Sequence, residues 1–118
     1  MITRTNALDV FDKELFGGPG YVTFTKIVDA QALAGNGRLF NIATLKPGHA
    51  IGYHEHKGEL EIYYILEGEG TYNDNGVESI VKAGDVTVCQ DGEGHGMINT
   101  GQADLKMVAL ILFTDRGK

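Results

Sequence analysis

Short runs of β-branched, aromatic and aliphatic residues alternate with turn signals along most of the chain. These runs fall at residues 22–28, 38–45, 51–56, 61–66, 71–73, 77–81, 86–89, 95–99 and 105–113. Asp74-Asn75-Gly76, between two of them, is typical of a tight β-hairpin. No long stretch repeats with a helical period. About nine short strands at close spacing predict an all-β, antiparallel, closed or nearly closed barrel and exclude the helical and α/β classes.

Two segments interrupt this strand pattern. Residues 9–16 are mixed in character and predict a short helical turn, which Gly17-Gly18-Pro19-Gly20 ends. Residues 29–37 predict a loop with its turn at Asn36-Gly37. A chain of 118 residues has room for one hydrophobic core. We therefore expect a single domain over 1–118, with the barrel core at 38–113 and an N-terminal arm at 1–37.

Composition and charge narrow the choice of partners and location. The 17 glycines suit a fold with many tight turns. A formal net charge of −6 without any Lys/Arg cluster argues against nucleic acid and membrane surfaces as partners. Cys89 is the only cysteine, so no intramolecular disulfide is expected. The longest apolar run, 107–113, is too short to span a bilayer, and residues 1–10 lack the apolar stretch of a signal peptide. These features predict a cytoplasmic protein.

Two histidines and a nearby glutamate form the first part of a candidate metal site. His54 and His56 are two residues apart, so on a strand they point to the same face, with Cα atoms about 7 Å apart. A turn at Lys57-Gly58 would bring the chain back and lay Glu61 beside them. Glu59 faces the same side as Glu61 and is the competing ligand, but it follows His56 too closely. We favour Glu61.

His95 is the fourth candidate, in a glycine-rich run that allows close backbone approach. Residues 48–68 contain the pattern G-x5-HEH-x4-E-x6-G, and residues 84–99 contain G-x5-QDG-x2-H-x3-N. In order, spacing and ligand type these stretches resemble the two motifs of the cupin superfamily. The one departure is Gln90, which stands where the family has a proline that shapes a turn and binds nothing.

The resemblance implies a small single-domain cupin, an antiparallel double-stranded β-helix or jelly-roll barrel. It also implies that His54, His56, Glu61 and His95 bind one divalent metal inside the barrel. Three imidazoles and one carboxylate suit Mn²⁺, Fe²⁺, Co²⁺, Ni²⁺ or Zn²⁺ and leave octahedral positions open for a chelating ligand. Manganese is the ion that the resemblance favours.

Strand alternation predicts which side chains share the barrel interior with the ligands. If Glu61 points inward, Tyr63 does too, and if His95 points inward, so does Met97. Tyr63 and Met97 are therefore the candidate substrate-facing residues, although plain barrel packing would explain both. We expect His49 to be a rim residue or a proton shuttle, and Cys89 to be a small buried hydrophobe.

The run from Gly52 to Gly70 is most similar to small oxalate-decarboxylase-like cupins. This resemblance implies a metalloenzyme that decarboxylates or oxidises a small carboxylate or other oxygen-rich chelating substrate. True oxalate decarboxylases carry an arginine three residues before the first histidine, and here that position is Ile51. Of the arginines, only Arg38 is expected near the barrel. The alternatives are a non-catalytic small-molecule binding module and a sugar isomerase or epimerase. Epimerases of that kind generally use a His–Asp pair without a metal.

Apolar side chains on the outside of the barrel predict self-association. Tyr64 and Leu66 alternate with inward positions, and residues 22–28 form a long apolar strand. This is more apolar surface than a small monomer usually exposes, so we predict a homodimer.

Overall fold

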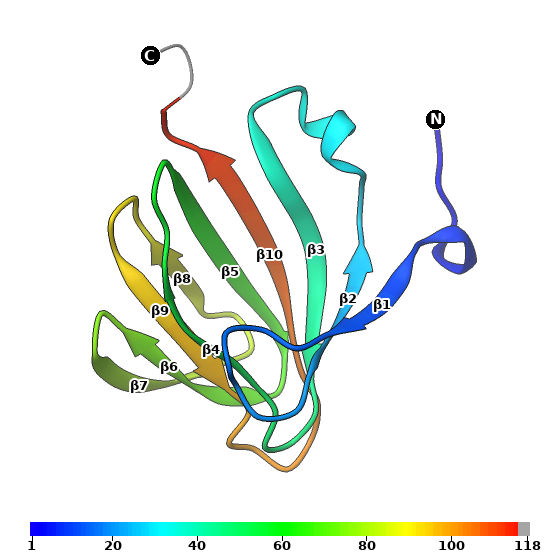
Figure 1. Ribbon diagram of the computed structural model, residues 1–118. Helices are drawn as coiled ribbons and strands as arrows, with labels where there is room; N and C mark the ends of the chain where they lie inside the picture. Colours follow the sequence, from blue (N-terminus) through cyan, green and yellow to red (C-terminus); the bar gives the residue numbers. More distant parts are fainter. Residues whose placement is uncertain (116–118) are drawn as a thin grey trace.

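The computed structural model describes residues 1–115 and consists of two antiparallel sheets that face each other (Figure 1). The larger sheet has the order β1-β2-β3-β10-β5-β8, and the smaller has the order β4-β9-β6-β7. The strands are β1 (Val10–Lys13), β2 (Val22–Lys26), β3 (Gly37–Leu45), β4 (Ala50–Glu55), β5 (Glu59–Glu67), β6 (Glu69–Asp74), β7 (Val77–Lys82), β8 (Val86–Cys89), β9 (Gly94–Ile98) and β10 (Leu105–Phe113). Two short 3₁₀ helices, η1 (Thr5–Ala7) and η2 (Ala30–Leu33), complete the elements. The predicted all-β antiparallel class is confirmed.

The hydrophobic core lies between the two sheets and follows strand alternation. On β10, which pairs with both β3 and β5, every second side chain from Leu105 to Ile111 is at most 3% exposed. On β5, Tyr63 and Ile65 are buried with Glu61, whereas Tyr64 between them is exposed. This alternation lets one strand supply core packing and a polar side chain to the same interior.

The hairpin between β6 and β7 forms where the sequence predicts it. Asn75 and Gly76 connect the strands with backbone φ angles of 52° and 95°. A two-residue loop with both residues in the left-handed region matches the twist of the flanking strands.

The N-terminal arm differs from the prediction. Residues 9–16 do not form a helical turn, because Val10–Lys13 pairs with the edge of β2 as strand β1. Phe11 lies opposite Phe24, and their ring centroids are 5.6 Å apart. Alternation of only four residues is too short to be recognised in the sequence, and the strand gains its stability from pairing along the β2 edge.

The loop at residues 29–37 also differs in detail from the prediction. It contains η2, and its left-handed residues are Ala34 (φ 54°) and Gly35 (φ 77°). Gly37 already belongs to β3, so the predicted turn at Asn36-Gly37 lies two residues too late.

The outer apolar surface is smaller than predicted. Tyr64 and Leu66 are exposed as expected, but Val22 and Phe24 on β2 are buried against the core. Each 3₁₀ helix has four residues or fewer, so no helix within residues 1–115 could cross a membrane.

Candidate metal centre

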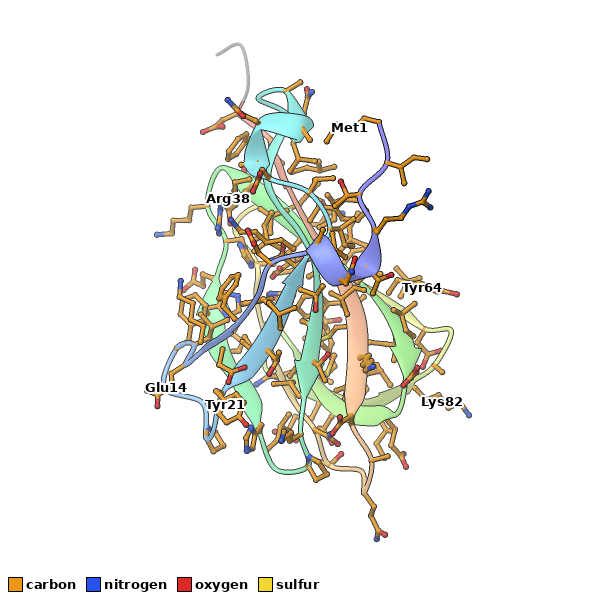
Figure 2. The ribbon with its side chains drawn as sticks, turned by 90° about the vertical axis from the view of Figure 1, so that its right-hand side faces the viewer. Met1, Glu14, Tyr21, Arg38, Tyr64 and Lys82 are labelled. Atoms are coloured by element: carbon orange, nitrogen blue, oxygen red, sulfur yellow. The ribbon has the colours of Figure 1, made fainter. Side chains whose placement is uncertain are left out.

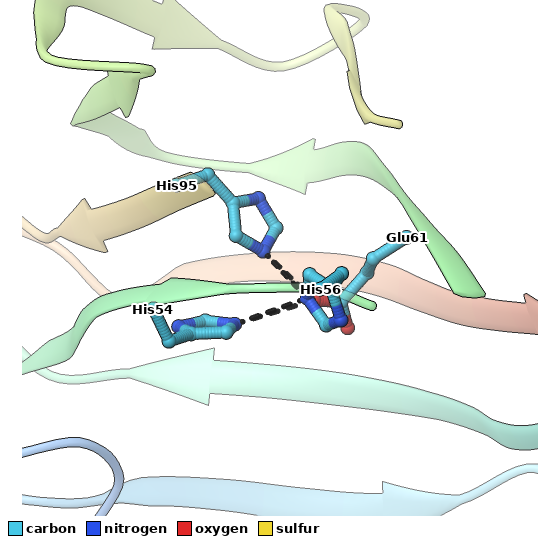
Figure 3. A group of neighbouring side chains, drawn as sticks. All are labelled: His54, His56, Glu61 and His95. Carbon is cyan, nitrogen blue, oxygen red and sulfur yellow. Dashed lines mark hydrogen bonds and ion pairs between the residues drawn. The ribbon is translucent and has the colours of Figure 1, made fainter. Parts of the chain in front are cut away.

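Four side chains from separate parts of the chain meet inside the barrel (Figure 3). β4 and β9 pair with His54 opposite His95, His56 follows the end of β4, and β5 in the facing sheet supplies Glu61. His56 Nε2 lies 3.1 Å from His54 Nε2, from His95 Nε2 and from Glu61 Oε1. His95 Nε2 lies 3.0 Å from Glu61 Oε1, and His54 Nε2 lies 3.9 Å from the same oxygen. The structure thus brings together the four residues singled out in the sequence.

The other nitrogen of each imidazole is occupied by a separate partner. His54 Nδ1 lies 2.8 Å from the carbonyl oxygen of Gly52, His56 Nδ1 lies 2.6 Å from Glu59 Oε2, and His95 Nδ1 lies 2.8 Å from Tyr72 Oη. A carbonyl or carboxylate oxygen only accepts, so Nδ1–H donates in the first two pairs, and it can donate to the Tyr72 oxygen as well. The lone pairs of all three Nε2 atoms are then directed at one another and at Glu61.

The electrostatics of the cluster favour a bound cation. Burial acts to raise the pKa of Glu61, but the three neighbouring histidines hold this pKa well below its ordinary value. The pKa of His56 is raised by its hydrogen bond to Glu61 against the opposing effect of burial, and burial lowers the pKa of His95. A buried carboxylate is therefore ionised among three imidazoles, and a cation held between the Nε2 atoms and this carboxylate would balance its charge.

The spacing of the donor atoms suits a transition-metal ion. Distances of about 3 Å between neighbouring donors match the edge of a coordination octahedron with bonds of about 2.1 Å. Imidazole nitrogens and one carboxylate are suitable donors for divalent ions of the first transition row, and four donors leave octahedral positions for another ligand. The residues present therefore fit one divalent metal.

Glu59 lies next to this group and not in it. Its carboxylate accepts a hydrogen bond from His56 Nδ1–H and two from Arg38, from Nε and Nη2, each at 2.8 Å. The Arg38 guanidinium is the main cause of the lowered pKa of Glu59. Glu59 thus orients His56 from behind, as carboxylates commonly do for metal-binding histidines. Sequence spacing does not reveal this role.

A cavity of about 140 Å³ adjoins the cluster. Tyr63 lines it, and its ring stacks on His95 with centroids 5.0 Å apart and planes 15° apart. Met97 is not among the described residues that line it. Along β9, Met97 lies two residues beyond His95, opposite Ile51 and Tyr72, and packs in the hydrophobic core. Because a strand rises about 3.3 Å per residue, the Met97 side chain lies farther along β9 than the part of the strand that adjoins the cavity.

The N-terminal arm supplies part of the cavity wall, which the sequence does not predict. Lys13, Leu15 and Phe16 line it together with Arg38. The Phe16 ring stacks on the His54 imidazole, with centroids 4.0 Å apart and planes 11° apart. The one sequence signal for such an approach is the cluster Gly17-Gly18-Pro19-Gly20, which can follow the barrel surface closely.

Two other candidates have structural contacts away from the cluster. His49 Nδ1 lies 3.0 Å from the carbonyl oxygen of Tyr21 and 3.2 Å from its backbone nitrogen, so this imidazole holds the loop before β2. Cys89 is buried, and burial raises the pKa of its thiol to about 11. Its thiol is therefore protonated near neutral pH and unreactive.

Comparisons with known proteins agree with the fold. The Cupin domain family model matches residues 41–111. The oxalate-binding protein of Thermotoga maritima is 45% identical over 96 residues, which cover 81% of this chain and 79% of that protein. The crystal structure of a predicted oxalate decarboxylase from T. maritima superposes with a TM-score of 0.91 at 39% identity, covering 96% of this chain and 99% of that one. A double-stranded β-helix protein from Klebsiella pneumoniae shares the fold alone, with a TM-score of 0.71 at 21% identity over 87% of this chain and 86% of that one. The chain belongs to the cupin family.

Proposed function

We propose that this protein binds one divalent transition metal at His54, His56, Glu61 and His95 and uses it to bind oxalate or a similar small dicarboxylate. The observation that carries the proposal is the convergence of three Nε2 atoms and one carboxylate oxygen, with every Nδ1 already engaged. A bound divalent ion would supply coordination positions for the oxygens of a chelating acid.

Manganese is the ion we propose. Imidazole and carboxylate donors accept Mn²⁺ without a thiolate that would favour zinc or copper. The resemblance of the motif region to oxalate-decarboxylase-like cupins also supports this choice.

The size of the cavity favours a small acid. Its volume of about 140 Å³ is below the roughly 300–1,000 Å³ of pockets that hold drug-sized ligands. Apolar side chains such as Leu39 and Ile111 form much of the remaining wall, so the polar contacts gather near the cluster. The relative from T. maritima that is described as oxalate-binding supports oxalate as the first ligand to test.

The residues that line the cavity favour a protein that binds its ligand without converting it. Glu61 is the only carboxylate among its described lining residues, and we assign it to the metal. Tyr63 is buried, and burial raises the pKa of its phenol well above the ordinary value. The described wall therefore holds no free carboxylic acid to exchange a proton with a reacting ligand.

Elemental analysis and calorimetry test this proposal together. We expect about one metal ion per chain, and saturable oxalate binding by Mn²⁺-loaded protein that disappears after the metal is removed. His54→Ala should lose both, whereas His49→Ala should keep both. Succinate, which is longer, should bind more weakly than oxalate. Oxalate binding that does not depend on metal would contradict the proposal, and so would unchanged metal content in His54→Ala.

We also propose a homodimer that uses the outer face of the large sheet. Tyr64 and Leu66 on β5 and Val86 and Val88 on β8 are exposed there, and β5 pairs with β8. In Figure 2, Tyr64 lies on the opposite side of the molecule from Glu14 and Arg38, so this face is remote from the cavity mouth. Light scattering at micromolar concentration should give the mass of a dimer, and Val86→Lys should shift it to a monomer. A monomeric wild-type protein would contradict this prediction.

A cytoplasmic location is our remaining proposal. It is supported by a single cysteine, Cys89, which is buried and forms no disulfide.

A further inference from the structure

The N-terminal arm is fastened to the barrel beside His54. The carbonyl oxygen of Leu15 accepts a hydrogen bond from the Gly52 N–H at 3.1 Å, and the carbonyl oxygen of Pro19 accepts one from the Ala50 N–H at 2.9 Å. Gly52 is also the residue whose carbonyl oxygen accepts the hydrogen bond from His54 Nδ1. The arm and the candidate metal ligand therefore share one segment of β4. In Figure 1 the loop after β1 reaches across to β4 before the chain returns to β2.

Phe16 adds a conformational argument for a fixed arm. Its φ angle is 55°, in the left-handed region that a bulky residue rarely adopts. Such a conformation persists where surrounding contacts determine it. Here the contacts are the stacked His54 ring and the adjoining Leu15 hydrogen bonds, from Gly52 N–H and from Gly18 N–H.

Strand alternation directs Lys13 to the cavity side of the arm. On β1, Phe11 and Lys13 face one side, and Asp12 faces the other, where its carboxylate accepts a hydrogen bond from Thr23 Oγ1 at 2.6 Å. Phe11 packs against the buried Phe24. Lys13 therefore lines the cavity that adjoins the metal cluster.

Lys13 and Arg38 are the two basic residues of the described cavity wall outside the histidines, and their situations differ. The Arg38 guanidinium makes a two-point contact with Glu59, so its charge is already balanced. No carboxylate within residues 1–115 forms an ion pair with Lys13. Lys13 is thus the basic side chain of the described wall without an ion-pair partner.

We propose that Lys13 binds a carboxylate of the ligand and gives the site its preference for dianions. This inference rests on the proposed metal-dependent binding of a small dicarboxylate. A divalent ion, the Glu61 carboxylate and the Lys13 ammonium sum to a charge of about +2, because Arg38 and Glu59 cancel. A dianion neutralises this charge, whereas a monoanion leaves about +1. Lys13 would then supply a cation for the ligand carboxylate, since position 51 is occupied by an uncharged isoleucine.

A comparison of two ligands in two variants tests the assignment. Oxamate has the size of oxalate, but an uncharged amide replaces one carboxylate. Calorimetry with Mn²⁺-loaded protein would measure oxalate and oxamate affinity in the wild type, in Lys13→Met and in Lys82→Met. Methionine keeps most of the side-chain length without the charge, and Lys82 lies on the opposite side of the molecule from Glu14 in Figure 2. Metal content of each protein is measured in parallel.

We expect Lys13→Met to weaken oxalate binding about tenfold and oxamate binding less than about threefold, with unchanged metal content. Lys82→Met should match the wild type with both ligands. Equal weakening of both ligands in Lys13→Met would overturn the assignment, and so would an unchanged oxalate affinity. Absence of oxalate binding to the metal-loaded wild-type protein would overturn the proposed function, whereas wild-type binding with an unchanged oxalate affinity in Lys13→Met would overturn this inference alone.

Discussion

Glu61→Gln should remove the metal from this protein, whereas Glu59→Gln should only weaken its binding. The two glutamates lie two residues apart on β5 and have different partners. Glu61 Oε1 lies among the three Nε2 atoms, while Glu59 contacts His56 Nδ1 and Arg38. Removing one member of a buried charge pair costs about 3–5 kcal/mol, a loss of about 150-fold to several thousandfold in affinity. Losing a partner that orients a ligand costs about ten- to a hundredfold.

Metal content after dialysis, together with competition against a chelator, measures this difference. Glutamine keeps the volume of glutamate, so circular dichroism should show both variants folded without metal. The pair also decides between the two carboxylates that the sequence offers as ligands. Loss of metal from Glu59→Gln with retention by Glu61→Gln would overturn the ligand assignment.

Gly52→Ala should detach the N-terminal arm and destabilise the protein. A Cβ at this position would collide with the carbonyl oxygen of Phe16 and lie 3.0 Å from the backbone nitrogen of Gly18. Both contacts are backbone atoms, so the arm itself must move. Overpacking of this kind costs about 1–3 kcal/mol. We expect a lower free energy of unfolding, weaker oxalate binding and faster tryptic cleavage after Lys13, because the arm opens more often.

Gly101→Ala is the matched control. There the nearest atom to a new Cβ is the Glu69 side-chain Cγ at 3.1 Å, and a side chain of this kind can rotate away. This variant should keep the wild-type cleavage rate after Lys13. Wild-type cleavage and stability in Gly52→Ala would show that the arm is not held against β4 as described.

The convergence of the four candidate ligands could be predicted because the sequence signals for them are local and regular. His54 and His56 share a strand face, and Glu61 and His95 occupy defined positions in two compact motifs. Strand alternation also gave the right orientation for Tyr63, since a period of two residues is visible in the sequence. The same alternation holds for Met97, which faces inward as predicted. Alternation does not show how far along the barrel a side chain lies. For this reason the sequence does not reveal that Met97 packs in the core and not at the cavity.

The rest of the cavity depends on contacts between distant segments. Phe16 and His54 stack although neither residue carries a periodic signal for the other. The four-residue strand β1 is too short to be distinguished from a helical turn before its partner β2 is known. Similarly, the position of Glu59 outside the cluster depends on Arg38, whose side chain comes from β3 and holds Glu59 behind His56.

The origin of the cavity wall from two parts of the chain has an evolutionary consequence. The histidines and Glu61 belong to the barrel, whereas Lys13 and Phe16 come from an arm outside residues 41–111, the stretch that matches the family model. On the proposed roles, substitution of Lys13 would change the acceptable ligands and leave the four donors in place, whereas substitution of Phe16 would also alter the packing of the His54 ring. At Lys13, ligand preference could then diverge among descendants of one ancestor while metal retention stays the same. Exchanging residues 10–20 between related chains would then change which small acids the cavity prefers through a single short segment.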